Sequence, residues 1–355
     1  MWPPLAPSVW LRRPVQRLPY PLDEPRVALH AWARHAIWRG VADLGLEPQD
    51  ELLVPAFHHG SEVEALIRRD LRCRFYEGGE DLSPRVDELE SMLTSRTRAL
   101  YLVHYLGFPQ DSARWRKWCD KRGLFLIEDA AQAWLSTHPD GQPTGSYGDL
   151  SVFCLYKTVG LPEGAISVGP GTPAKRPLDR RPGARELARR HAWWVVGRSG
   201  LATAGAALLR RRYPGSFDAD SEFDLRDPNA MPWSTTRYLL RRLADPHTAD
   251  LRRSNYAELL RELSELVPPP FDRSPNGASP FVFPIEAEDK ARTLRGLRDR
   301  GIVALDLWSY AHPLLPVESV PSIARRRTRM IGLPVHQELR RVDLERIADA
   351  VCALC

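Results

Sequence analysis

One lysine of this sequence stands where an amine could do chemistry. The chain is rich in arginine but has few lysines, namely Lys117, Lys121, Lys157, Lys175 and Lys290. Lys157 closes the stretch from Gly148, whose central apolar residues predict a buried strand that delivers the amine to its end. Free lysine, with a pKa of about 10.4, is a poor nucleophile, but burial and nearby positive charge lower that pKa. Lys157 is therefore the first candidate catalytic residue.

Two acids follow a second apolar run. This run, from Leu124 to Ile127, ends in Glu128 and Asp129. Ligands of open parallel sheets bind at the carboxyl ends of strands, so an acid and a lysine at neighbouring ends can share a site. Pyridoxal phosphate requires this pair: the amine holds the cofactor covalently, and the carboxylate keeps its pyridine nitrogen protonated. Taken by itself, Lys157 also suits a surface lysine at a strand end.

The order and flanks of these two segments resemble the DegT/StrS-type sugar aminotransferases, a branch of the fold type I pyridoxal-phosphate enzymes. Three further stretches fit that family in the same order: Glu51 to Ala56, Tyr101 to Pro109 and Gly332 to Gln337. The resemblance implies a homodimeric aminotransferase that binds pyridoxal 5'-phosphate and moves an amino group, from glutamate as the donor, to a keto sugar. A nucleotide-linked sugar of polysaccharide or secondary metabolite biosynthesis is the implied acceptor, and a non-sugar keto acceptor stays open.

The resemblance also assigns residues around the cofactor ring. Asp129 stands where the family places the acid on the pyridine nitrogen, and Glu128 would point to the other face of the strand. Gln132 resembles the family residue near the phenolic oxygen, with a helix-surface glutamine as the alternative. His59 matches the position that stacks on the ring, with a loop histidine as the alternative.

The cofactor's phosphate is expected at a helix N-terminus, where free backbone N–H groups and the helix dipole receive an anion. The residues at 33–35 resemble a subgroup of the family at this point, so Arg34 and His35 are candidate phosphate contacts, with an exposed helix arginine as the alternative. Cys154 takes the place of a phosphate-binding serine, and a thiol is the weaker donor. His104 ends its strand on the ligand side, where it either contacts substrate or, packed and hydrogen-bonded, orders the following loop.

The elements that must position these residues alternate between strand and helix from Glu51 onward, at the spacing of βαβ units. This pattern predicts the α/β class, with a doubly wound, mostly parallel sheet. We expect an N-terminal arm over residues 1–28, a large pyridoxal-phosphate-binding domain over 29–240 and a smaller α+β domain over 241–355. Predicted strands cover 51–55, 72–76, 98–104, 124–127, 151–155, 165–168 and 281–285, and predicted helices cover 30–44, 61–69, 84–93, 112–122, 184–212, 233–243, 250–266, 289–300 and 342–354.

Composition excludes several other classes. The chain is 43% hydrophobic but has no run of eighteen apolar residues, so no membrane span is expected. The N-terminus lacks the basic start and apolar block of a secretory signal, which favours the cytoplasm. The net charge of +5 is modest, and the arginine clusters at 210–212 and 325–327 are expected to be solvated helix faces rather than nucleic-acid sites. Neither the five cysteines nor the pair His58 and His59 has the spacing of a metal site.

A second hypothesis comes from a different class. The chain could keep the fold without the chemistry, as a binding or scaffold subunit of a biosynthetic pathway. The atypical residues at 33–35, Cys154 and the loss of one glycine from the turn after Lys157 favour this reading. The presence of both Lys157 and Asp129 favours an enzyme, which we take as the main hypothesis.

Overall fold

Two β-sheets organise the protein. The computed structural model describes residues 3–170, 184–198, 229 and 231–355. A seven-stranded sheet has the order β1-β7-β6-β5-β4-β2-β3, and a three-stranded sheet has the order β8-β10-β9. The strands of the large sheet are β1 (Val27–His30), β2 (Glu51–Pro55), β3 (Arg72–Tyr76), β4 (Thr97–Val103), β5 (Phe125–Asp129), β6 (Leu150–Cys154) and β7 (Ala165–Val168).

The inner strands of the large sheet are buried and parallel. Strands β3, β2, β4, β5 and β6 pair in parallel, whereas β7 and β1 each pair antiparallel to their neighbour. Every residue of β6 is buried, as are the last four of β5, which is why both segments read as continuous apolar runs in the sequence. The predicted strand bounds of β2, β3 and β7 are confirmed, and those of β4, β5 and β6 shift by one or two residues.

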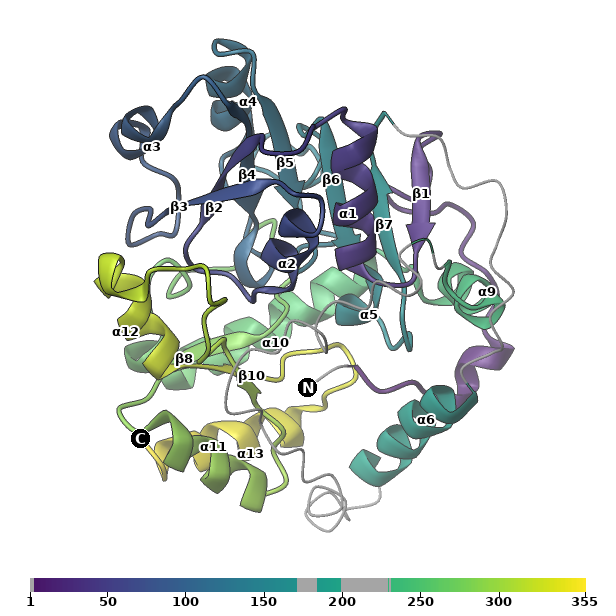
Figure 1. Cartoon of the computed structure of the whole chain (residues 1–355). Helices are drawn as coiled ribbons and strands as arrows, with labels where there is room; N and C mark the ends of the chain where they lie inside the picture. The colour runs from purple at the N-terminus through teal and green to yellow at the C-terminus, as the bar shows by residue number, and fades with distance from the viewer. Residues whose placement is uncertain (1–2, 171–183, 199–228, 230) are drawn as a thin grey trace.

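Helices cover both faces of the large sheet, as predicted for a doubly wound fold (Figure 1). On one face α1 (Ala33–Asp43) packs against α2 (Ser61–Ile67) and over β6 and β7. On the other face α4 (Ser112–Asp120) packs over β4 and β5, where its Trp115 and Trp118 are buried. The short helix α3 (Val86–Met92) lies beside β3.

The C-terminal part surrounds the small sheet of β8 (Phe283–Glu286), β9 (Leu305–Asp306) and β10 (Met330–Leu333). Its apolar core is continuous with the core of the large sheet, since Val54 of β2 and Ile331 of β10 belong to one cluster of buried residues. Its helices are α9 (Ser234–Leu243), α10 (His247–Leu263), α11 (Lys290–Asp299), α12 (Pro321–Arg329) and α13 (Arg341–Cys352).

The N-terminal segment packs against later segments of the same chain. A 3-10 helix, η1 (Pro7–Leu11), follows Leu5, whose N–H bonds to the Arg190 carbonyl on α6 (Ala184–Arg198), and the Val15 N–H bonds to the Arg241 carbonyl on α9. The chain then enters the sheet as β1. The prediction of a helix from His30 was wrong at its start, because residues 27–30 pair with β7 and α1 begins only at Ala33.

Two other predictions agree with the structure only in part. The helix expected over 184–212 is present as α6 up to Arg198, and residues 199–212 lie outside the described residues, as does the arginine cluster at 210–212. The prediction that the arginines at 325–327 form a solvated face was wrong for Arg327, which is 2% exposed and donates to the carbonyls of Trp308 and Ala56. The domain boundaries at residues 28 and 240 stay predictions.

Two general findings complete the fold. None of the helices in the described residues is long and apolar enough to cross a membrane. All five cysteines are free thiols, and within the described ranges no three metal-binding side chains come together.

Candidate active site

A cavity of about 780 Å³ opens at the carboxyl ends of the large sheet's parallel strands. Five of the residues singled out from the sequence line it together, namely Arg34, His59, Asp129, Gln132 and Lys157. They come from the start of α1, the loop before α2, the end of β5 and the turn after β6. Their convergence makes this cavity the candidate active site.

Lys157 lies in α5 (Leu155–Thr158), a single turn of helix that begins directly after β6. Its Nζ is 5.6 Å from the ring centroid of Phe281, on the segment that leads into β8. At this distance a cation over the face of an aromatic ring is attracted to the ring, so Phe281 helps to orient the amine. The turn thus presents the amine to a cavity formed by both sheets.

Two side chains hold the backbone of this turn. Arg252 of α10 donates to the carbonyl oxygens of Lys157 at 3.2 Å and Thr158 at 2.7 Å. Gln337, after β10, donates to the same Thr158 oxygen at 3.2 Å and accepts from Arg252 Nε at 3.0 Å. Arg252 is 1% exposed and also donates to the Pro280 carbonyl at 2.7 Å. Sequence reasoning missed Arg252, because an arginine in a helical pattern is usually solvated.

Asp129 is the last residue of β5 and is buried. Its Oδ1 accepts the Ala131 N–H at 2.9 Å, and its Oδ2 accepts the Tyr101 hydroxyl at 2.7 Å. Burial, followed by the charge of Glu62, raises the pKa of Asp129, whereas the two hydrogen bonds and the Lys157 charge act in the opposite direction. Asp129 and Lys157 are therefore electrostatic neighbours on one cavity.

Gln132 is oriented by the backbone. Its Oε1 accepts the N–H of Leu106 at 3.0 Å. Leu106 adopts a left-handed conformation with φ 53°, which brings its N–H to the glutamine. Because the oxygen end of the amide is engaged, the amide group that Gln132 can offer a ligand in the cavity is its NH2 donor.

His59 and Glu62 lie where the loop after β2 enters α2. The backbone N–H groups of His59 and Gly60 bond to the Glu62 carboxylate at 3.0 and 3.1 Å. The His59 ring stands edge-on to Trp308, with centroids 6.4 Å apart. Trp308 also lines the cavity and holds a left-handed φ of 58°, which is strained for an aromatic residue. Sequence reasoning did not single out Trp308.

The start of α1 forms another part of the cavity wall. Trp32, Ala33 and Arg34 line the cavity, and Trp32 caps the helix with its backbone only. The Arg34 guanidinium lies 5.2 Å from the centroid of the Trp32 ring. His35, the other phosphate candidate, is 3% exposed and is not among the lining residues. The helix end therefore offers backbone N–H groups and one arginine to an anion.

Cys154 lies beneath the cavity surface. It is fully buried, and burial raises the pKa of its thiol. Tyr156 and Cys154 influence each other's ionisation, and Tyr156, not Cys154, lines the cavity. The side chain that faces a ligand at this strand end is therefore a phenol next to the lysine, which sequence reasoning missed.

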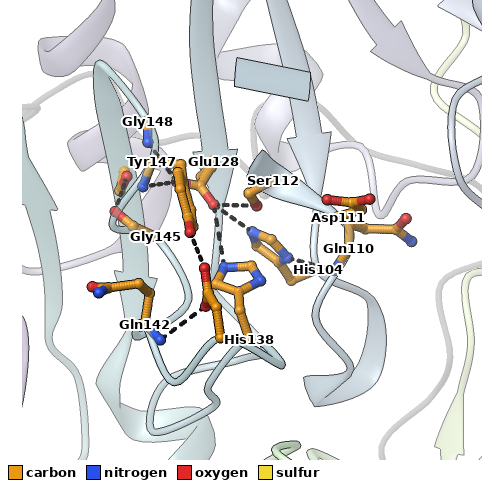
Figure 2. Close-up of polar contacts among 12 residues, drawn as sticks. His104, Gln110, Asp111, Ser112, Glu128, His138, Gln142, Gly145, Tyr147 and Gly148 are labelled. Carbon is orange, nitrogen blue, oxygen red and sulfur yellow. Dashed lines mark hydrogen bonds and ion pairs between the residues drawn. The ribbon is translucent and has the colours of Figure 1, made fainter. Parts of the chain in front are cut away.

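His104 belongs to a cluster on the far side of β5 (Figure 2). Its Nε2 lies 3.1 Å from Glu128 Oε1, and its Nδ1 accepts the Gln110 N–H at 3.0 Å. It is fully buried and does not line the cavity, which corresponds to the packed, hydrogen-bonded alternative that the sequence left open.

The Glu128 carboxylate is the centre of this cluster. It accepts the Ser112 hydroxyl at 2.5 Å and the N–H groups of Tyr147 and Gly148 at 2.8 and 2.5 Å (Figure 2). Burial raises the pKa of Glu128, but the hydrogen bonds and charge of His104, with Ser112, outweigh it, so the pKa is lower than usual. Adjacent residues of β5 thus face opposite sides, with Asp129 on the cavity.

The outer cavity wall comes from α6 and the C-terminal part. Trp194 Nε1 donates to Glu338 Oε2 at 3.2 Å and thereby links α6 to the segment after β10. This wall combines tryptophan rings with arginines that outnumber its acids, Glu186, Glu338 and Asp343, and rings and guanidinium groups suit a ligand with flat and anionic groups. Its residues include Arg189, Trp193, Trp194, Arg198, Arg298 and Arg346.

Comparison with known proteins defines the class. Residues 32–165 match the model of the DegT/DnrJ/EryC1/StrS aminotransferase family. The match includes Arg34, His59, Asp129, Gln132 and Lys157. The predicted recognition is therefore confirmed.

The curated relatives are nucleotide-sugar enzymes by name. The chain is 32% identical over 136 residues to a GDP-perosamine synthase of Vibrio cholerae. The matched segment covers 38% of this chain and 37% of the relative. It is 31% identical over 193 residues to the UDP-N-acetyl-3-dehydro-alpha-D-glucosamine 3-aminotransferase of Acidithiobacillus ferrooxidans, which covers 50% of this chain and 49% of the relative. The chain thus matches less than half the length of these relatives.

Solved structures match over nearly the whole chain. A putative sugar aminotransferase of Streptococcus pneumoniae, in its PMP form, has a TM-score of 0.66 at 17% identity and covers 99% of this chain and 93% of its own. The aminotransferase TlmJ of Streptoalloteichus hindustanus has a TM-score of 0.62 at 22% identity and covers 92% and 85%. These likenesses confirm the predicted fold, the α/β fold of the fold type I aminotransferases.

The cavity fits pyridoxal phosphate by the chemistry of its residues. Lys157 supplies the amine, Asp129 the carboxylate and Gln132 an amide donor, and all three line one cavity. The N-terminus of α1, an 11-residue helix, opens on the same cavity with Arg34 beside it, as a phosphate requires. Enzymes of this family use this cofactor, and the described residues contain the groups to hold it.

Proposed function

We propose that the protein is a pyridoxal-phosphate-dependent aminotransferase that moves an amino group, with glutamate as the donor, to a keto sugar carried on a nucleotide. One observation carries the proposal. Lys157 and Asp129 come from different strand ends and line one cavity, while the neighbouring Glu128 turns away into a buried cluster. An amine and a carboxylate brought together in this way support cofactor chemistry rather than a surface role.

When bound, pyridoxal phosphate supplies the electron sink for bond changes at the amino-bearing carbon. Lys157 would hold the cofactor through Nζ and would carry the proton to and from the substrate carbon. Asp129 would keep the ring nitrogen protonated through its carboxylate. Gln132 would donate from Nε2 to the phenolic oxygen, and the N-terminus of α1 with Arg34 would receive the phosphate. His59 would lie against the ring.

The acceptor is proposed from the relatives and from the outer cavity. The names of the similar proteins include GDP-, UDP- and dTDP-linked sugars. The outer wall here carries Trp193, Trp194 and several arginines. Tryptophan rings suit a nucleobase and guanidinium groups suit a diphosphate, so this wall supports a nucleotide-linked substrate.

The test begins with the cofactor. Purified protein is mixed with pyridoxal phosphate, reduced with borohydride, digested and analysed by mass spectrometry. The expected results are a visible absorption band before reduction and, after reduction and digestion, a cofactor-labelled peptide that contains Lys157. Lys157→Ala should lose both, whereas Lys117→Ala, at an exposed position of α4, should keep them. Substrate panels then pair glutamate with nucleotide-linked and free keto sugars.

If the purified protein takes up no cofactor, the result would support the scaffold hypothesis, in which the fold binds a partner and catalyses no reaction. Transfer to free keto acceptors with no preference for nucleotide-linked sugars would refute the proposed acceptor class alone.

We also propose that the enzyme acts as a cytoplasmic homodimer. The homodimer rests on the resemblance to its family. The five free thiols support a reducing compartment. Light scattering on the purified protein tests the homodimer, and a monomer at micromolar concentration would contradict it.

A further inference from the structure

The phenol of Tyr101 contacts the carboxylate that the proposed function places on the cofactor's ring. Tyr101 lies on β4, and its hydroxyl donates to Asp129 Oδ2 on the neighbouring strand β5 at 2.7 Å. Tyr101 is fully buried, so this hydrogen bond is shielded from water. Asp129 Oδ1 already accepts the Ala131 N–H. Each carboxylate oxygen thus has one fixed donor.

Asp129 needs such donors because its surroundings oppose its charge. Burial and the carboxylate of Glu62 on α2 both favour the protonated form of Asp129, whereas the two hydrogen bonds and Lys157 on α5 favour the ionised form. Two further groups that interact with Asp129 are Tyr105 and Cys154, whose ionisation it disfavours. A protonated Asp129 could not hold a ring nitrogen in its charged state.

Tyr101 differs from the other buried tyrosines that surround the site. The hydroxyl of Tyr76 donates to the Tyr101 carbonyl at 3.0 Å, and the hydroxyl of Tyr105 donates to the Phe57 carbonyl at 2.7 Å. Both are bonds to backbone oxygens, which serve packing of the strands and loops. Tyr101 instead donates to a side-chain carboxylate on the cavity.

We propose that Tyr101 is a positioning residue that keeps Asp129 ionised and fixes which oxygen faces the cofactor's ring nitrogen. The link to the ring nitrogen rests on the proposed function, but the effect on Asp129 itself does not. A hydrogen bond from a buried phenol to a carboxylate stabilises the anion selectively, because the protonated acid is a weaker acceptor. Loss of this donor should therefore shift both Asp129 and the ring nitrogen toward their neutral forms.

The first experiment uses the protein without cofactor. Carboxyl-13C aspartate is incorporated, the Asp129 resonance is assigned by its absence in Asp129→Asn, and its pH titration is followed. Tyr101→Phe, which keeps the ring and its packing, should take up the Asp129 proton at higher pH than the unsubstituted protein. Tyr76→Phe is the matched control, since it removes a buried phenol from the same region, and should leave the titration unchanged.

The second experiment uses pyridoxal phosphate labelled with 15N in the ring. In Tyr101→Phe the bound nitrogen resonance should move toward that of an unprotonated pyridine, and amino transfer should slow about tenfold. Tyr76→Phe should change neither. A merely structural role for Tyr101 would not move the nitrogen resonance while the cofactor stays bound.

The two experiments separate failure of the inference from failure of the proposed function. An unchanged Asp129 titration in Tyr101→Phe overturns the inference, whatever the cofactor does. If the unsubstituted protein binds no pyridoxal phosphate, the proposed function fails, and the carbon titration still decides whether Tyr101 keeps Asp129 charged.

Discussion

The Arg252 guanidinium donates hydrogen bonds to the carbonyl oxygens of Lys157 and Thr158, so the turn that carries the amine is fastened to α10. The same group reaches Pro280, just before the cavity-lining Phe281. Burial lowers the pKa of Arg252 to about 9, so the cation persists at neutral pH. One side chain therefore sets the relative positions of a catalytic turn and two segments of the C-terminal part.

Arg252→Met should destabilise the protein by about 3 kcal/mol, since several buried oxygens lose their hydrogen-bond donor while the aliphatic part of the side chain is kept. Urea denaturation measures the change. Arg253→Met is the control. Arg253 is more exposed than Arg252 and bonds to Ala278 and Asp250, so this substitution should cost about 1 kcal/mol or less. Equal effects of the two substitutions would show that Arg252 is not a special anchor.

Asp129→Asn should retain covalent attachment of the cofactor to Lys157 but slow amino transfer by a factor of about 1,000 or more, because an uncharged partner cannot hold the ring nitrogen protonated. Absorption spectra and single-turnover kinetics with glutamate measure the two effects separately. Near-normal turnover in this variant would refute the role assigned to Asp129.

Glu128→Gln should cost about 3 kcal/mol of unfolding free energy and leave cofactor attachment intact. Whichever way the new amide lies, its NH2 group faces hydrogen-bond donors, either His104 and Ser112 or the N–H groups of Tyr147 and Gly148. Thermal or urea unfolding and borohydride trapping measure the two properties. Loss of cofactor binding in well-folded Glu128→Gln would mean that the far side of β5 acts on the cavity after all.

A control for this variant lies on α13. Glu345 is more than half exposed and pairs with Arg341 at 3.0 Å. Glu345→Gln removes one carboxylate charge at the surface and should change stability by less than about 0.5 kcal/mol.

His30 should make stability depend on pH in the mildly acidic range. Burial, with a smaller effect of Arg39, lowers the pKa of His30 to about 3, and its Nε2 lies 2.8 Å from Ser167 Oγ. The unfolded chain binds this proton below about pH 6.5, whereas the folded protein does not. The contribution of His30 is therefore complete above about pH 6.5 and is lost as pH falls, by about 2 kcal/mol at pH 5.

His30→Gln should flatten this dependence, as seen in urea midpoints measured between pH 7 and 5. His247→Gln is the control, because that side chain is 85% exposed. A pH dependence that is as steep in His30→Gln as in the unsubstituted protein would assign the loss to other groups.

The large sheet could be predicted from the sequence because its inner strands are buried on both faces and read as apolar runs. The edge strand β1 could not, since only His30 of its four residues is buried and its pairing with β7 depends on the assembled sheet. Strands β9 and β10 are short, and β10 contains a glycine, so neither has a lasting pattern. Helix α12 was not among the predicted elements, although the arginines at 325–327 were expected on a helix face.

The site was predictable where a residue type is unusual for its place. Lys157 and Asp129 stand out at strand ends, whereas the burial of Arg252 and the reach of Tyr101 to Asp129 follow only from tertiary contacts. The sequence also could not predict how deeply the side chains at the end of β6 are buried. Cys154 still belongs to β6, and α5 begins at the next residue, so the thiol stays inside the sheet while Tyr156 and Lys157 emerge.

The alternation of Glu128 and Asp129 makes β5 intolerant of any change in its length. An inserted or deleted residue in the strand would rotate its C-terminal end by half a turn, exchanging the acid of the cavity with the acid of the His104 cluster. Both acids would then meet the wrong partners at once. Variation among descendants of this chain should therefore accumulate as substitutions in β5, with gains and losses of residues confined to the loops around it.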